Sequence, residues 1–146
     1  MATGAFTDAT PVATEVYSVE IFVPANAVIT GIAIRSGSVA SGNVKVGLTD
    51  VAGTLLKTSA STAVAGAAGV YQRVPFTGGT YNIVGPATYY VQSFYDNNTA
   101  RYTALTEGNC GAAKLTGQVY STGIVTNAGL APTTFTTALG PVASLY

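Results

Sequence analysis

Apolar and polar side chains alternate with a period of two residues along much of the chain. The clearest example is 16–23, which would place Tyr17, Val19, Ile21 and Val23 on one face and Val16, Ser18, Glu20 and Phe22 on the other. A long segment with the spacing of an amphipathic helix is absent. Pro24-Ala25-Asn26 follows this run and should end the strand, because proline cannot donate to a ladder. The pattern predicts an all-β protein.

Similar runs bounded by Gly, Pro, Asn and Ser predict the other strands. They are expected at 28–35, 44–49, 54–58, 70–77, 80–84, 88–95 and 100–106, with short strands at 133–137 and 142–146. Pro75 should mark an edge or a bulge. The Ala- and Gly-rich segment 59–69 lacks an apolar stripe and is expected to be a loop. About eight or more short strands favour a single antiparallel β-sandwich or jelly roll.

Two of these strand pairs are expected to be hairpins. Asp50-Val51-Ala52-Gly53 should turn the chain after 44–49, because Asp can bond the turn backbone and Gly supplies a positive φ. Asp96-Asn97-Asn98-Thr99 should likewise join 88–95 to 100–106. We therefore expect the two strands of each hairpin to be neighbours in a sheet.

A symmetric turn in the second hairpin would sort its side chains into two faces. One face, with Tyr89, Val91, Ser93, Tyr95, Ala100, Tyr102, Ala104 and Thr106, is typical of a core. The other would carry Tyr90, Gln92, Phe94, Arg101, Thr103 and Leu105. Phe94 would stand opposite Arg101, within reach of a cation–π contact worth about 0.5–1 kcal/mol. Aromatic and guanidinium groups are enriched in interface cores, so Tyr90, Phe94 and Arg101 are predicted partner-binding residues. The alternative is that both faces are covered within the domain.

The chain has the length of one domain, 1–146, without a change of composition that would mark a linker. Residues 1–14 are a candidate N-terminal arm. The loop-rich part 107–146 either supplies the last strands of the sandwich or forms an arm that reaches a neighbour. We favour strands, because termini that pair in a sheet are held in place.

Composition points to packing against other proteins. Charged residues make up 8% of the chain, with six Lys and Arg balancing six Asp and Glu, against about 25% in ordinary soluble domains. A neutral surface does not suit nucleic acid, but it loses little hydration when a protein partner covers it. We expect a homo-oligomer or a larger assembly; the alternative is a compact secreted monomer.

The sequence offers few routes to catalysis. It contains no His, and its one cysteine, Cys110, lies in a predicted loop. Glu15 and Glu20 differ by an odd number of positions and should point to opposite faces of a strand. In the predicted hairpin, Asp96 and Glu107 would lie about 26 Å apart at about 3.3 Å per residue, whereas glycosidases need about 5–10 Å. We expect a protein that is not an enzyme and that holds no cofactor or metal.

The N-terminus lacks a basic region followed by an apolar run, and no stretch reaches the roughly 20 apolar residues of a membrane span. We expect no membrane association and folding in a cytoplasm.

Several runs together resemble small β-sandwich structural proteins of tailed bacteriophage virions. They are Val28-Ile29-Thr30-Gly31-Ile32, Gly47-Leu48-Thr49-Asp50 with Gly53, Tyr71-Gln72-Arg73-Val74-Pro75-Phe76, Gly85-Pro86 with Thr88-Tyr89-Tyr90-Val91, and Gly140-Pro141-Val142-Ala143-Ser144-Leu145-Tyr146. The resemblance lies in the kinds of residues along these runs and in the spacing of the turns, and it covers most of the chain from about Val16. It implies a capsid decoration or cement subunit, or a comparable small head or tail component, of the virion, bound to the major capsid protein or another virion protein.

Comparable strands occur in carbohydrate-binding modules, so a second reading stays open. In it the chain is a glycan-recognising adhesion module of a phage tail fibre or a bacterial surface protein. Nine Tyr and five Phe could supply flat platforms for sugar rings, although Trp is absent.

Overall fold

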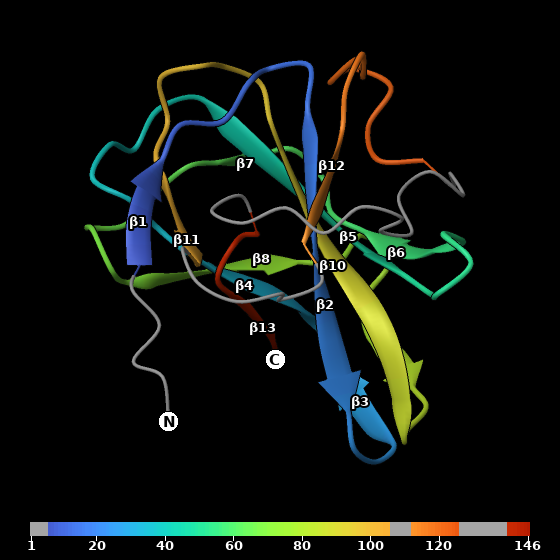
Figure 1. Ribbon diagram of the computed structural model, residues 1–146. Helices are drawn as coiled ribbons and strands as arrows, with labels where there is room; N and C mark the ends of the chain where they lie inside the picture. Colours follow the sequence, from blue (N-terminus) through green and yellow to red (C-terminus); the bar gives the residue numbers. More distant parts are fainter. Residues whose placement is uncertain (1–5, 106–111, 126–139) are drawn as a thin grey trace.

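The computed structural model describes residues 6–105, 112–125 and 140–146, and the regular elements of these residues are all strands (Figure 1). They are β1 (Phe6–Ala9), β2 (Val16–Val23), β3 (Ala27–Ile29), β4 (Gly31–Arg35), β5 (Asn43–Thr49), β6 (Leu55–Thr58), β7 (Thr62–Ala63), β8 (Tyr71–Pro75), β9 (Tyr81–Ile83), β10 (Ala87–Tyr95), β11 (Tyr102–Leu105), β12 (Ala113–Leu115) and β13 (Ala143–Leu145). The all-β, sandwich-like class predicted from the sequence is confirmed.

The larger sheet has the order β12-β2-β10-β5-β6, and β7 adds a short pairing to β5. β10 lies at its centre and pairs antiparallel on both sides. Its residues 87–94 lie opposite β2, and its residues 90–95 lie opposite β5. Both hydrogen-bonding edges of β10 are therefore occupied over most of its length.

The remaining strands form the second layer. β13, β4 and β8 make a three-stranded sheet, while β1 pairs with β11 and β3 pairs with β9. Two isolated bridges, Ser36 to Tyr102 and Ala104 to Pro141, connect β11 with the chain next to β4 and β13. The β3–β9 ribbon extends this layer beyond Thr30. At this point the Phe76 amide donates a hydrogen bond to the Thr30 carbonyl at 2.9 Å.

Apolar side chains from both layers fill the space between them. Tyr102 of β11 packs on two tyrosines of the larger sheet, with ring centroids 5.3 Å from Tyr17 and 5.6 Å from Tyr95. All three rings are almost fully buried. Burial raises the pKa of each phenol well above its usual value. This tyrosine cluster joins the two layers at the centre of the core.

The same cluster holds the start of β2. The Tyr17 hydroxyl donates to a Glu15 carboxylate oxygen at 2.8 Å and accepts from the Val12 amide at 2.9 Å. The other Glu15 oxygen accepts from Lys114 of β12, also at 2.8 Å. A buried carboxylate is tolerated here because it is paired and hydrogen-bonded.

Most predicted strands are present. The run 16–23 forms β2 with the predicted bounds, and Tyr17, Val19, Ile21 and Val23 face the core. The run 28–35 is divided at Thr30 into β3 and β4. Pro75 ends β8, an edge strand of its sheet, as its missing amide hydrogen predicts.

The first predicted hairpin is confirmed. β5 and β6 pair antiparallel across a turn in which the Asp50 carboxylate accepts from the amides of Ala52 and Thr54 at 2.9 and 2.8 Å. Gly53 adopts a φ of 82°, which favours glycine.

The second predicted hairpin is wrong. β11 pairs with β1 in the other layer, and β10 pairs with β2 and β5. The physical reason is that β10 has no free edge for β11 in the larger sheet. The chain therefore crosses between the layers at 96–101, and the sequence alone could not reveal that two other strands occupy β10.

Side chains stabilise this crossing. The Asp96 carboxylate accepts from the Asn43 amide at 2.8 Å, from the Asn43 side chain at 2.7 Å and from Asn97 at 2.7 Å. The Asn97 side-chain oxygen in turn accepts from the Thr99 and Ala100 amides, both at 2.8 Å. Partial burial acts to raise the pKa of Asp96, but these hydrogen bonds outweigh it and hold the pKa below its usual value.

The terminal regions also join the sheets. The first fourteen residues, a candidate arm, contribute β1, and the described part of 107–146 contributes β12 on β2 and β13 on β4. The sequence analysis missed β12, and it also missed the two-residue β7, which pairs with β5 inside the predicted loop 59–69. By contrast, β13 lies within the predicted strand 142–146. The predicted strand 133–137, Glu107 and Cys110 lie outside the described residues.

We predict that Asp96→Asn lowers the free energy of unfolding at pH 7 by about 1–3 kcal/mol, because hydrogen bonds to a charged group are lost. A carboxyl whose pKa is lowered on folding stabilises the fold above its unfolded pKa of about 3.9, and this stabilisation is lost as the pH falls through the folded pKa. Urea unfolding at pH 3–7 should show the gap between the two proteins narrowing below about pH 4. A gap independent of pH would contradict this role of Asp96.

Candidate protein interface

The three predicted partner-binding residues do not form one exposed surface. Tyr90 is half-buried on β10, opposite Glu20 of β2 and Thr49 of β5. Burial raises the pKa of its phenol, and the nearby Glu20 carboxylate raises it further. Arg101 lies in the crossing between the layers, where its amide donates to the Val39 carbonyl at 2.9 Å. The expected cross-strand contact between Phe94 and Arg101 is therefore wrong, because β11 does not pair with β10.

Phe94 is fully buried within the domain. It belongs to a second apolar cluster with Val16 and Ile124, on the side of the larger sheet that faces away from the tyrosine cluster. The Tyr120 ring meets it edge to face with a centroid distance of 5.2 Å. Segment 112–125 thus covers this part of the sheet, as the alternative interpretation of the sequence required, and Phe94 is not available to a partner.

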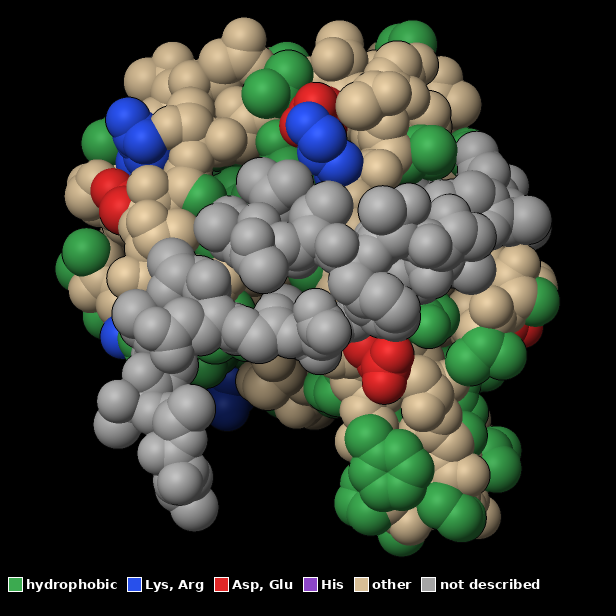
Figure 2. All heavy atoms as spheres, viewed as in Figure 1, with side chains coloured by type: hydrophobic (Ala, Val, Ile, Leu, Met, Phe, Trp, Pro, Cys, Tyr) green, Lys and Arg blue, Asp and Glu red, His purple; other side chains and the backbone are tan. Residues whose placement is uncertain are grey.

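A different apolar surface lies at one end of the molecule. Phe22, Val28 and Val84 are 62, 65 and 61% exposed. Figure 2 shows hydrophobic side chains gathered on the part that projects at the lower right, where Figure 1 places the end of β2 and β3. We call the exposed residues 22, 24–28, 84 and 86 the apolar tip.

Two neighbouring turns build the apolar tip. The Asn26 side chain accepts from the Gly85 amide at 2.9 Å, and the Tyr89 hydroxyl donates to the Val84 carbonyl at 2.7 Å. A Cβ on Gly85 would lie 2.6 Å from the backbone nitrogen of Ala25. Only glycine fits this close approach, so the turns after β2 and β9 are held against each other.

Beside the apolar tip the two layers separate and leave a groove of about 470 Å³. Its walls come from β2, from the β3–β9 ribbon and from β13, and they are mainly apolar: Ile21, Phe22, Val23, Ile29, Ile83 and Leu145 among them. Val23, Ile29 and Ile83 in these walls are themselves buried, so the groove lies directly over the core. An apolar side chain from another protein would fill the groove and complete the packing.

The apolar tip is also free of charge. Lys, Arg, Asp and Glu are absent from the two runs 21–34 and 74–95, which between them contain the strands and turns of this end. Covering such a surface removes apolar area from water without stripping an ion of its hydration. Monomeric proteins rarely expose a large continuous apolar patch without an interaction role.

The described residues contain no group of three or more His, Cys, Asp and Glu that could hold a metal ion. No helix among them is long and apolar enough to cross a membrane. Glu15 is buried beside Lys114, while Glu20 is exposed on β2. The predicted separation of Asp96 and Glu107 depended on the hairpin that does not form, and Glu107 lies outside the described residues.

Comparison with known proteins finds no matching family model, no matching curated protein and no matching solved structure.

Sequence reasoning missed the apolar tip, although two signals were present. Phe22 falls on the outward face of the predicted strand 16–23, and the runs 21–34 and 74–95 lack charge. Neither signal shows by itself that the two runs meet at one end of the fold. The pairing of β3 with β9 and of β2 with β10 brings them together.

We predict that Phe94→Ala lowers the free energy of unfolding by about 3–5 kcal/mol, because it empties a packed site. Arg101→Ala should cost less than about 1 kcal/mol, since this side chain is only half-buried. Chemical denaturation measures both. If the Phe94→Ala protein were instead as stable as the wild type but no longer assembled, Phe94 would be a partner-binding residue.

We also predict that the double substitution Phe22→Ser and Val28→Ser reduces self-association while changing the free energy of unfolding by about 0.5 kcal/mol or less. Val51→Ser is the matched control, because Val51 is 59% exposed in the β5–β6 turn. Sedimentation velocity over a range of concentrations measures the effect. If the wild type, the double variant and the control associated equally, the apolar tip would not be the surface that mediates association.

Proposed function

We propose that this protein is a non-enzymatic structural subunit of a virion, and that it decorates and stabilises a phage head by packing against the capsid through the apolar tip. The observation that carries the proposal is the exposure of Phe22, Val28 and Val84 at one uncharged end of the molecule. The resemblance of the sequence to small virion β-sandwich proteins supports the same setting.

The surface as a whole suits assembly in many copies. Charged residues make up 8% of the chain, so few fixed charges compete with packing. Each contact of a small apolar surface is modest. Oligomerisation makes later contacts intramolecular, which raises the overall affinity without adding a new contact. A homo-oligomer bound to the major capsid protein is the arrangement that best uses such a surface.

The direct test is to purify virions of the phage that encodes the protein and to measure its copy number by mass spectrometry. We expect the protein in the particles in many copies, and we expect particles without it to lose DNA at a lower temperature. Its absence from the particles would refute the proposal.

A second test locates the contact. Stripped particles should bind the wild-type protein and the Val51→Ser control equally, while Phe22→Ser with Val28→Ser should bind at least about tenfold more weakly, a loss of about 1.4 kcal/mol. Equal binding of all three proteins would place the contact elsewhere on the surface.

A further inference from the structure

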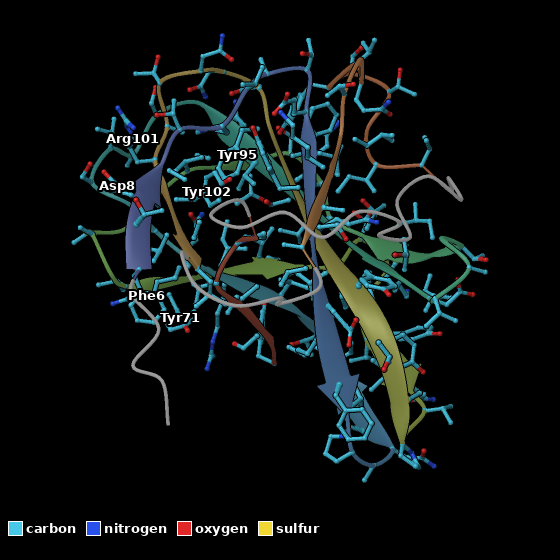
Figure 3. The ribbon with its side chains drawn as sticks, viewed as in Figure 1. Phe6, Asp8, Tyr71, Tyr95, Arg101 and Tyr102 are labelled. Carbon is cyan, nitrogen blue, oxygen red and sulfur yellow. The ribbon has the colours of Figure 1, made fainter. Side chains whose placement is uncertain are left out.

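A second groove lies where β1 meets the loop after β4, at the end of β4 away from the apolar tip. Its volume is about 350 Å³, within the range of about 300–1,000 Å³ usual for small-ligand sites. Its walls are contributed by β1, by the end of β4 and by the loop before β8: Phe6, Asp8, Arg35, Gly37, Ser38 and Gly69 among them. Residues far apart in the sequence thus form one depression, with Phe6 and Asp8 at the edge of the molecule (Figure 3).

Arg35 supplies hydrogen-bond donors in this groove. Its guanidinium carbon lies 4.6 Å from the centre of the Phe6 ring, and its Nε donates to the Gly69 carbonyl at 3.0 Å. These two contacts fix the plane of the group. Within the described residues neither terminal nitrogen has a hydrogen-bond partner, and no carboxylate pairs with it. A half-buried, oriented guanidinium with free N–H groups is prepared to bind oxygen atoms of a ligand.

Asp8 supplies acceptors in the same groove. Its carboxylate accepts from the Ser38 amide at 3.0 Å and from the Ser38 hydroxyl. An ionised carboxylate can accept about four hydrogen bonds, so each of its oxygens keeps capacity for a ligand. Because Ser38 holds the carboxylate in place, the groove presents an oriented acceptor as well as an oriented donor.

Gly37 keeps the floor open between these groups. A Cβ at this position would lie 2.6 Å from the Arg101 backbone carbon and would also overlap the Asp8 carboxylate. The Gly37 amide donates to the Arg101 carbonyl at 3.0 Å, which ties the floor to the crossing between the layers. The groove therefore depends on a residue without a side chain.

Two exposed rings flank the guanidinium. Phe6 is 54% and Tyr71 is 48% exposed. Tyr71 of β8 stands directly opposite Arg35 of β4, so their side chains share one face of the sheet, with Cβ atoms about 4.5–5.5 Å apart. Figure 3 places Phe6 and Tyr71 at the same edge of the molecule, below Asp8.

From this arrangement we propose that the groove of Phe6, Asp8 and Arg35, together with the exposed Tyr71 ring opposite Arg35 on the same face of the sheet, binds a neutral carbohydrate. A pyranose ring presents C–H groups on its faces, which pack on aromatic rings, and hydroxyls on its rim. Each hydroxyl can donate one hydrogen bond and accept others. Neighbouring hydroxyls of a sugar can therefore accept from Arg35 and donate to Asp8 at the same time.

The charge of the groove favours an uncharged ligand. A carboxylate- or phosphate-bearing ligand at Arg35 would meet the negative Asp8, and an ammonium at Asp8 would meet Arg35. A neutral polyol uses both groups without either repulsion. This site differs from the predicted partner-binding face of Tyr90 and Phe94, because the rings of Phe6 and Tyr71 are exposed whereas Phe94 is buried. It does not depend on the proposed function, since β4 separates the groove from the apolar tip.

The test begins with an array of neutral hexose and N-acetylhexosamine oligosaccharides together with uronic-acid and phosphate-bearing glycans. The full-length protein is clustered on fluorescent beads, so that weak binding is amplified by avidity. We expect binding to neutral glycans. Titration calorimetry with the best neutral oligosaccharide should then show affinity at least about tenfold weaker for Tyr71→Ala and for Arg35→Gln.

Val51→Ser is the control, because Val51 is 59% exposed in the β5–β6 turn and lies outside both the groove and the apolar tip. It should leave the affinity unchanged. Tyr71→Ala, which truncates an exposed side chain, should keep the thermal unfolding midpoint of the wild type and so separates binding from folding. Binding of no glycan, binding of acidic glycans alone, or an affinity that neither Tyr71→Ala nor Arg35→Gln changes would overturn the proposal.

Discussion

The structure depends on the double pairing of β10. This strand accepts β2 on one side and β5 on the other, so its backbone groups are satisfied within one sheet and its next neighbour in sequence must go elsewhere. The chain crosses to the second layer at Asp96 and Asn97, whose hydrogen bonds form the corner. β11 then brings Tyr102 against Tyr17 and Tyr95, which closes the core between the layers.

The same constraint shapes both ends of the molecule. Where β2 and β10 extend beyond the central core, they meet the β3–β9 ribbon, and the two layers end in the uncharged apolar tip. At the other end of β4, the crossing leads into β11 and its partner β1. Phe6 of β1 packs on Arg35, and Asp8 lines the same groove. One sheet arrangement thus produces an apolar surface suited to protein contact and a polar groove suited to a small ligand.

The two surfaces differ in the free energy that binding would draw on. At the apolar tip the gain comes from apolar area removed from water, which is non-directional and tolerates a range of partner shapes. In the groove the gain comes from hydrogen bonds to oriented donors and acceptors, which favour a ligand whose hydroxyls match their positions.

Much of the local structure was predictable because local physics decides it. The alternation in 16–23 predicts β2, the Asp50 turn predicts the β5–β6 hairpin, and Pro75 predicts an edge. Strand pairing was not predictable in the same way. The turn at Asp96-Asn97 is compatible with a hairpin, yet β10 pairs with strands that lie some 70 and 45 positions earlier in the chain.

The candidate sites follow the same division. By itself the sequence determined most of the strands, the scarcity of charge and the outward position of Phe22. Only the tertiary structure decided that Phe94 is buried, that Phe22, Val28 and Val84 meet at one end, and that Phe6 and Asp8 lie beside Arg35. Alternation and turn chemistry act over a few residues, whereas the competition of strands for the edges of β10 is settled only when the whole chain packs.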